Sequence, residues 1–212
     1  MDTNELVQLL AADARPRGAS ISSVWWGAVG LAITLAAAVF LATLDPRPDI
    51  VAAAETPRFL LKFVVAIMLA ASAFGLDRAL SRPGGTWRKA MPYLAAAPVL
   101  LAMAVIVELL LLPPDTWSAK LVGTNSVVCL TFIPLLGIGP LIIFLLALRH
   151  GAPSRPILAG AVAGLLAGGI AATFYAVQCT DDSPLFVATW YTAAISGLAV
   201  AGAVGAHLLA RW

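Results

Sequence analysis

The chain has 212 residues, of which 61% are hydrophobic and only 11% are charged, and its mean hydropathy is +0.94. Soluble domains carry about 25% charged residues, so this composition excludes an ordinary soluble domain and predicts a polytopic membrane protein. The formal net charge of +2, without any basic run, also excludes a nucleic-acid-binding surface.

Six apolar segments are long enough to cross a bilayer, which takes roughly 20 residues per helix. They cover residues 24–44, 59–80, 91–112, 127–148, 157–177 and 185–209. The first has full spanning length and no small-residue cleavage site, so we expect a retained helix and not a cleaved signal. The predicted fold is all-α, with a domain of six transmembrane helices over residues 24–212 and a separate N-terminal segment over residues 1–23.

The distribution of basic residues predicts the orientation, because Lys and Arg near helix ends are retained on the cytoplasmic side. Nine of the 13 lie on the face that holds both termini: Arg15, Arg17, Arg78, Arg82, Arg88, Lys89, Arg149, Arg155 and Arg211. The opposite face carries four basic and six acidic residues: Arg47, Arg58, Lys62, Lys120, Asp45, Asp49, Glu55, Asp115, Asp181 and Asp182. We therefore expect both termini in the cytoplasm.

The segment before the first span reads as a short amphipathic helix. Asp2 and Glu5 have the spacing of a capping box, and Leu6, Leu9 and Leu10 follow on one apolar face. A free helix of this length is marginal in water. Two interpretations remain open: the helix lies on the bilayer surface, or its leucine face docks into a groove of a cytosolic protein.

The first two spans carry residues with conventional membrane roles. Trp25 and Trp26 are expected to mark the interface at the start of the first span. Lys62 and Asp77 lie near opposite ends of the second span, where we expect both side chains to reach the headgroups.

The third span contains Glu108, about one turn from its outer end. An acid within a membrane helix is a functional candidate. Close to the interface, however, Glu108 can also be a structural residue that is solvated or paired with Lys120 in the next loop.

The last three spans combine proline, glycine and cysteine. Cys129 falls in the first turn of the fourth span, and Pro134 and Pro140 further along loosen that helix, which makes it a candidate moving part. Small residues recur at four-residue spacing in the last two spans: Gly160, Gly164 and Gly168, then Gly197, Ala201 and Gly205. Such faces favour close helix packing and also suit a homo-oligomer.

A very short turn between the fifth and sixth spans carries Cys179, Asp181 and Asp182 at the outer face. Cys129, 50 positions earlier, lies on the same side. The two cysteines are either fillers of apolar space or a reactive or bridging pair in an oxidising compartment. The acids would slow oxidation of Cys179 but could add oxygen ligands to a cation. No histidine joins them there, so the sequence predicts no complete zinc site and no cofactor.

The sequence gives an enzyme little support. It has no Cys-x-x-Cys, no Ser/His/Asp set and no nucleotide loop, and His150 and His207 both lie toward the inner side. A transporter would need polar groups at mid-membrane, where the spans are nearly bare. A membrane thiol oxidoreductase and a small transporter remain the alternatives.

Several features together carry a resemblance across essentially the whole chain. They are the N-terminal leucine helix, six spans, a cysteine opening the fourth, LRHGAP over 148–153, a Gly/Ala-rich fifth span and CTDDSPLFVATWY over 179–191. The chain resembles the NrsF-type membrane anti-sigma factors. This implies a bacterial inner-membrane protein that sequesters an extracytoplasmic-function sigma factor through its cytoplasmic N-terminal region and releases it under stress.

The resemblance also implies roles for individual residues. Glu5, Leu6, Leu9 and Leu10 are the expected sigma-binding residues, and Cys129 and Cys179 the expected sensors. Asp181, Asp182 and Glu108 are expected to support them. A histidine often precedes the second cysteine in this family, whereas this chain has Gln178, which favours thiol oxidation over metal binding.

Overall fold

The structure is a computed structural model that describes residues 20–82, 86–151, 153 and 155–209, together with residues 2, 3, 5 and 8. Every secondary-structure element in this part of the chain is helical, and six of the helical segments are long and apolar enough to span a membrane. The long helices are α2 (Ile21–Thr43), α4 (Pro57–Leu80), α6 (Ala96–Leu111), α8 (Ser126–Leu148), α9 (Pro156–Gln178) and α11 (Thr192–Leu209). All six predicted spans are therefore confirmed as helices.

Local signals explain where these helices begin. Ser20 caps α2 by accepting a hydrogen bond from the Ser23 amide (3.1 Å). Proline occupies the first turn of α4, α9 and the short α10 (Pro184–Phe186), where its missing N–H would have no helical partner anyway.

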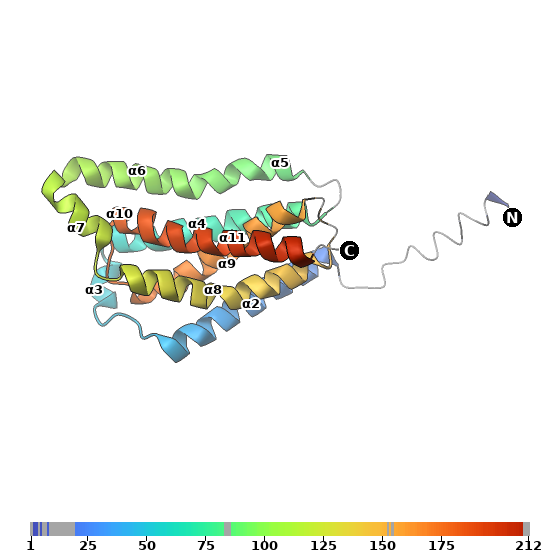
Figure 1. Cartoon of the computed structure of the whole chain (residues 1–212), viewed down its shortest axis with the longest axis horizontal. Coiled ribbons are helices and arrows are strands. Elements are labelled where there is room, and N and C mark those ends of the chain that lie inside the picture. The colour runs from blue at the N-terminus through green and yellow to red at the C-terminus, as the bar shows by residue number, and fades with distance from the viewer. Residues whose placement is uncertain are drawn as a thin grey trace.

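Short helices fill most of the connections. α3 (Ile50–Ala54), η2 (Pro114–Thr116) and α7 (Trp117–Val122) lie in two loops, α5 (Trp87–Ala90) and η1 (Met91–Ala95) extend α6 at its N-terminus, and the π-helical turn η3 (Val187–Tyr191) joins α10 to α11. The start of α2 and the end of α11 lie at the same end of the bundle (Figure 1). We call this the inner end and the opposite the outer end, after the orientation that the charges predict.

Helix α9 is the centre of the bundle, packed against α11, α4, α8 and α2. Its contact with α11 is closest at Gly160 and Gly164, because a Cβ at either position would clash with the α11 backbone at Gly202 or Leu198. The glycine face predicted on the fifth span thus packs within the chain. Gly197 of α11 borders open space instead, and association between copies stays a prediction.

Helix α6 lies at the edge of the bundle (Figure 1). It packs mainly on α4, α10 and η3, and side chains such as Ile106 and Leu110 remain exposed. Only Ala97, Leu101 and Glu108 of this helix are buried.

At the inner end the expectations for Trp25 and Asp77 are wrong, whereas Trp26 is exposed. Trp25 is fully buried, where its indole N–H donates to the Ser81 hydroxyl (3.1 Å) and its ring stacks on Phe144. Asp77 is fully buried as well, and neither of its carboxylate oxygens has a hydrogen-bond partner among the described residues. Because both side chains are fully buried in the bundle, they are not placed to reach the headgroups.

Candidate functional site

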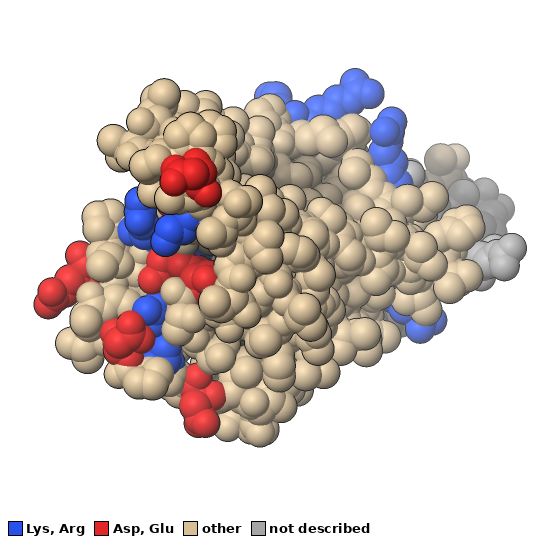
Figure 2. Space-filling view, turned by 60° about the vertical axis from the view of Figure 1, so that its left-hand side comes forward, with Lys and Arg blue, Asp and Glu red and all other residues tan. Residues whose placement is uncertain are grey.

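Charged side chains gather at the outer end of the bundle. Figure 2 shows acidic and basic residues intermixed there, whereas the rest of the visible surface carries only scattered basic groups. Part of this cluster is buried, including Arg47, Lys62 and Glu108. The buried charges surround the 179–183 turn, which connects α9 to α10.

The turn begins where α9 ends. Cys179 leaves the helix in an extended conformation while its amide still donates to the Tyr175 carbonyl (3.0 Å). Its own carbonyl then points away from the helix. Pro184 restarts a helix only after Ser183, so the intervening backbone depends on side chains from other elements for hydrogen bonds.

Lys62 of α4 is the most buried of these side chains, with 1% exposure. Its ammonium donates to the Cys179 carbonyl (2.8 Å) and forms an ion pair with Asp182 (2.6 Å). The expectation that Lys62 reaches the headgroups is therefore wrong, because both acceptors draw the ammonium into the protein.

Arg47, in the loop between α2 and α3, binds the same turn. Its guanidinium contacts Asp182 (2.9 Å) and the Cys179 carbonyl (3.3 Å), and its other edge holds Asp49 at 2.7 Å through two parallel hydrogen bonds. The hydrogen bonds from Arg47 lower the pKa of Asp49, and those to Asp49 raise the pKa of Arg47. The Cys179 carbonyl thus accepts from two cations.

Asp181 ties the turn to the loop before α8. One carboxylate oxygen accepts from the amide and hydroxyl of Thr124 (3.0 and 3.2 Å) and from the backbone and side-chain amides of Asn125 (2.8 and 2.9 Å). Burial alone would raise the pKa of Asp181, but these hydrogen bonds outweigh it and the pKa is lowered. Gly123, with φ of 59°, lets the loop approach closely, since a Cβ there would meet the Phe186 ring and Asp181.

Glu108 connects α6 to the other side of the turn. Its carboxylate accepts from the Ser183 hydroxyl (2.7 Å) and the Leu185 amide (3.1 Å), and it lies 3.6 Å from Arg58. The predicted pairing with Lys120 is wrong, because Glu108 points inward with 3% exposure toward the start of α10. Its structural interpretation is supported by these contacts.

The two cysteines lie next to this network as buried free thiols. Cys129 is in the first turn of α8, Cys179 ends α9, and both are fully buried. They share their surroundings with Tyr175 and Tyr191, whose ring centroids are 5.6 Å apart. Burial raises the pKa of the Cys179 thiol, although Lys62 counteracts it. The two thiols are therefore buried in the structure and do not form an exposed pair.

The remaining predictions concern the sigma-binding residues and a metal site. Leu6, Leu9 and Leu10 lie outside the described residues, and Glu5 is exposed. Within the described residues, no three His, Cys, Asp or Glu side chains converge on one point as metal ligands would.

Sequence reasoning missed the cations at the centre of the network. Lys62 carried a usable signal, because a charged residue inside an apolar span is expected to have a partner. For Arg47, Arg58 and Asn125 no local pattern distinguished them from ordinary loop or interface residues.

Known proteins are similar to this chain over its whole length. A family model described as "Negative regulator of sigma F" matches residues 10–212. The anti-sigma-F factor NrsF of Caulobacter vibrioides is 33% identical over 217 residues, and a probable anti-sigma-F factor NrsF of Azospira oryzae is 32% identical over 224 residues. Each alignment covers all of this chain and all of the relative. No solved structure matches.

Proposed function

This chain belongs to the NrsF family of negative regulators of sigma F, and we propose that it is a bacterial inner-membrane anti-sigma factor. In this proposal, residues 1–23 hold an extracytoplasmic-function sigma factor in the cytoplasm through Glu5, Leu6, Leu9 and Leu10. A stress signal at Cys129 and Cys179 on the outer side releases it. The names of both relatives support the regulatory role.

One observation carries the sensing half of the proposal: the carbonyl of Cys179 is the shared acceptor of Lys62 and Arg47. A disulfide forms when two thiols give two protons and two electrons to an oxidant. The two alpha carbons must then lie within about 7 Å. A movement of the Cys179 backbone during this reaction would lengthen the hydrogen bonds from Lys62 and Arg47 to its carbonyl, and so disturb α4 and the loop before α3.

Burial of the thiols sets a condition on this mechanism. Thiolates are the species that oxidants and soft metals attack, and both sulfurs are shielded in the structure. The signal must therefore enter while the turn is transiently open. Asp181, Asp182 and Glu108 control that opening, because their hydrogen bonds close the turn onto α8, α4 and α6.

A pull-down of the full-length chain from its native cells tests the sigma-binding half. We expect a sigma factor to be retained by the full chain and by Gln8→Ala, and lost when residues 1–20 are deleted or Leu6, Leu9 and Leu10 are all changed to alanine. Gln8 is an exposed neighbour of the leucine stripe and serves as the matched control. Absence of a sigma factor from the wild-type sample would contradict the proposal.

The purified complex tests the sensing half. We expect the thiol oxidant diamide to release the sigma factor from the wild type but not from Cys129→Ser or Cys179→Ser, both of which still bind it. Cadmium ion, a thiol-seeking metal, provides the second arm and distinguishes oxidation from metal binding. Equal release from the wild type and both variants would rule out the cysteines as sensors.

A further inference from the structure

The two buried cysteines differ in the groups that face their sulfur atoms. Cys179 ends α9 on extended backbone, and its thiol donates to the Asp181 carbonyl at 3.7 Å. The Lys62 ammonium, which binds the Cys179 carbonyl (2.8 Å), and the Tyr191 hydroxyl also lie beside this residue. The Cys129 thiol makes no hydrogen bond within the described part of the chain. The two thiols therefore have unequal surroundings, although both are fully buried.

Tyr191 has a buried hydroxyl with no partner in the resting state. The hydroxyl lies against the Cys179 thiol but makes no hydrogen bond to it or to any other described group. Buried tyrosine hydroxyls are normally paired, and an unpaired one costs free energy. A neutral thiol is only a weak acceptor, whereas a thiolate is a charged and much stronger one. The Tyr191 hydroxyl is therefore placed to gain its hydrogen bond when Cys179 ionises.

The local fold holds Tyr191 in this position. The residue ends the π-helical turn η3, a geometry found frequently at functional sites. Trp190, the preceding residue, donates to the Leu121 carbonyl (2.8 Å) and so ties η3 to α7. The Tyr191 ring packs on Tyr175 and Phe186, with ring centroids 5.6 and 6.3 Å away. These contacts fix the hydroxyl beside the sulfur before any reaction begins.

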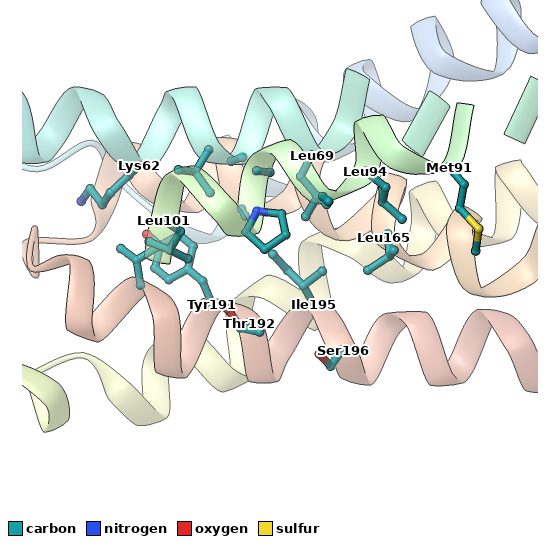
Figure 3. A pocket seen from close by; sticks show the side chains of 17 residues that line it. Lys62, Leu69, Met91, Leu94, Leu101, Leu165, Tyr191, Thr192, Ile195 and Ser196 are labelled. Atoms are coloured by element: carbon teal, nitrogen blue, oxygen red, sulfur yellow. The ribbon is translucent and has the colours of Figure 1, made fainter. Parts of the chain in front are cut away.

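Lys62 adds a positive charge on the same side of Cys179. Figure 3 shows Lys62 and Tyr191 at one end of the pocket, with the Lys62 amine pointing away from the apolar side chains. Burial raises the pKa of the Cys179 thiol, and Lys62, the Asp181 amide and the Tyr191 hydroxyl oppose this effect. The charged and titratable groups around Cys179 are Lys62 on α4, Cys129 on α8, Tyr175 on α9, Tyr191 on η3, Arg47 in the loop before α3, and Asp181 and Asp182 in the turn.

Cys179 is also the thiol that a local opening exposes more readily. The next residue, Thr180, is exposed and lines a cavity of about 490 Å³ together with Asp181 and Asp182. The backbone at Cys179 is extended, so this turn can move without unwinding a helix. The Cys129 amide, in contrast, donates to the Asn125 carbonyl (2.8 Å) at the start of α8. Segments outside the helical ladder open at lower free energy.

We propose that Cys179 is the attacking thiol of the pair, that Tyr191 is a positioning residue which stabilises its thiolate, and that Cys129 is the resolving thiol. With diamide as the two-electron oxidant, the Cys179 thiolate adds to one nitrogen of the N=N bond, and the other nitrogen takes up a proton. Cys129 then attacks the Cys179 sulfur, so that the S–S bond forms and the S–N bond breaks. The leaving nitrogen takes the second proton, which gives a hydrazine. This assignment rests on the cysteine-sensing half of the proposed function.

The first test uses the wild-type, full-length chain in detergent micelles. A substoichiometric amount of N-ethylmaleimide is added at neutral pH, where it alkylates thiolates, and peptide mass spectrometry then identifies the modified cysteine. We expect Cys179 to carry severalfold more label than Cys129. Equal labelling of the two cysteines, or preferential labelling of Cys129, would overturn the assignment without any variant being needed.

The second test isolates the Tyr191 hydroxyl in a Cys129→Ser background, where Cys179 is the only thiol. Tyr191→Phe should lower the alkylation rate at neutral pH about tenfold, as expected for loss of one hydrogen bond to a charged group. It should also move the pH profile of the rate upward. Tyr175→Phe is the matched control, because its hydroxyl belongs to the same aromatic pair but donates to the Asn125 carbonyl (3.5 Å). Its profile should stay within about twofold of the parent.

The sign of the effect separates this role from simple packing. A variant that only loosens the turn exposes Cys179 and speeds alkylation at every pH, whereas loss of thiolate stabilisation slows it at neutral pH and not at high pH. Size-exclusion profiles verify that each variant is folded. An unchanged or faster profile for Tyr191→Phe, or equal effects of the two tyrosine variants, contradicts the role of Tyr191. These assays contain no sigma factor, so the assignment can fail while diamide still releases the sigma factor through both cysteines.

Discussion

The two ends of the bundle differ in whether their buried charged side chains have partners. At the outer end, Lys62, Arg47 and Glu108 are buried, and each has charged or backbone partners around the 179–183 turn. At the inner end, the basic side chains Arg88 and Lys89 are exposed, and the buried acid Asp77 has no partner among the described residues.

This difference indicates where the fold is specific. A network of paired buried charges fixes one arrangement of several elements, because breaking a contact leaves a charge unpaired at low dielectric. One carboxylate oxygen of Glu108 accepts no hydrogen bond within the described residues, but it lies 3.6 Å from the Arg58 guanidinium. An exposed basic surface imposes no such arrangement. Moving the Cys179 turn at the outer end would therefore disturb several elements at once, whereas the exposed charges of the inner end fix no such arrangement.

The strongest test of the comparison is Lys62→Met. The variant removes the ammonium while keeping most of the side-chain volume, leaving the Cys179 carbonyl and Asp182 dependent on Arg47. We expect a loss of about 3 kcal/mol in the free energy of unfolding, as for other broken buried ion pairs. The measurement is SDS titration of the full chain in mixed micelles. Lys89→Met, at the exposed inner end, should change the value by less than about 0.5 kcal/mol, and equal effects would refute the contrast.

A smaller effect is expected for Glu108→Gln. The amide oxygen can still accept from Ser183 and the Leu185 amide, but the charge that strengthens both bonds and attracts Arg58 is lost. We expect a loss of about 1.5 kcal/mol in the same assay. Glu55→Gln is the matched control, because Glu55 is exposed at the same end. A neutral result for Glu108→Gln would mean that α6 is held by its apolar contacts alone.

The sequence predicts the helices of this fold better than its site. Each span depends on the composition of its own 20 or so residues, so hydropathy located all six, and the topology placed Cys129 and Cys179 at one end. The network depends on which helices are neighbours: Lys62 and Cys179 are 117 positions apart. Near a helix end, Lys62 suits a headgroup contact equally well, and only the packing of α4 on α9 decides between them.

Asp181→Asn tests the outer end through the pH dependence of the free energy of unfolding. The pKa of Asp181 is lowered in the folded state, so its ionised form contributes stability above the unfolded value near 3.9. That contribution is lost as the pH falls through the lower folded pKa. We expect the wild type to exceed the variant by about 1 kcal/mol at pH 7.

Below about pH 4 the difference between wild type and Asp181→Asn should decrease. Unfolding midpoints measured between pH 3 and pH 7 follow this change. Asp115→Asn, an exposed acid of the same end, should show no comparable trend. A difference that is independent of pH would indicate that Asp181 contributes through its shape and not its charge.

The smallest expected effect concerns Asp77 at the inner end. Unlike the other substitutions, Asp77→Asn is expected to increase the free energy of unfolding. Asp77 must either stay ionised without a partner or bind a proton within the bundle, and both cost free energy. Asp77→Asn removes this requirement at nearly constant volume, so we expect a gain of about 0.5 kcal/mol in the free energy of unfolding. Asp45→Asn, exposed at the outer end, should be neutral. If Asp77→Asn instead destabilises the chain, the Asp77 carboxylate has a partner in the membrane-embedded protein, and buried charge is satisfied at both ends of the bundle.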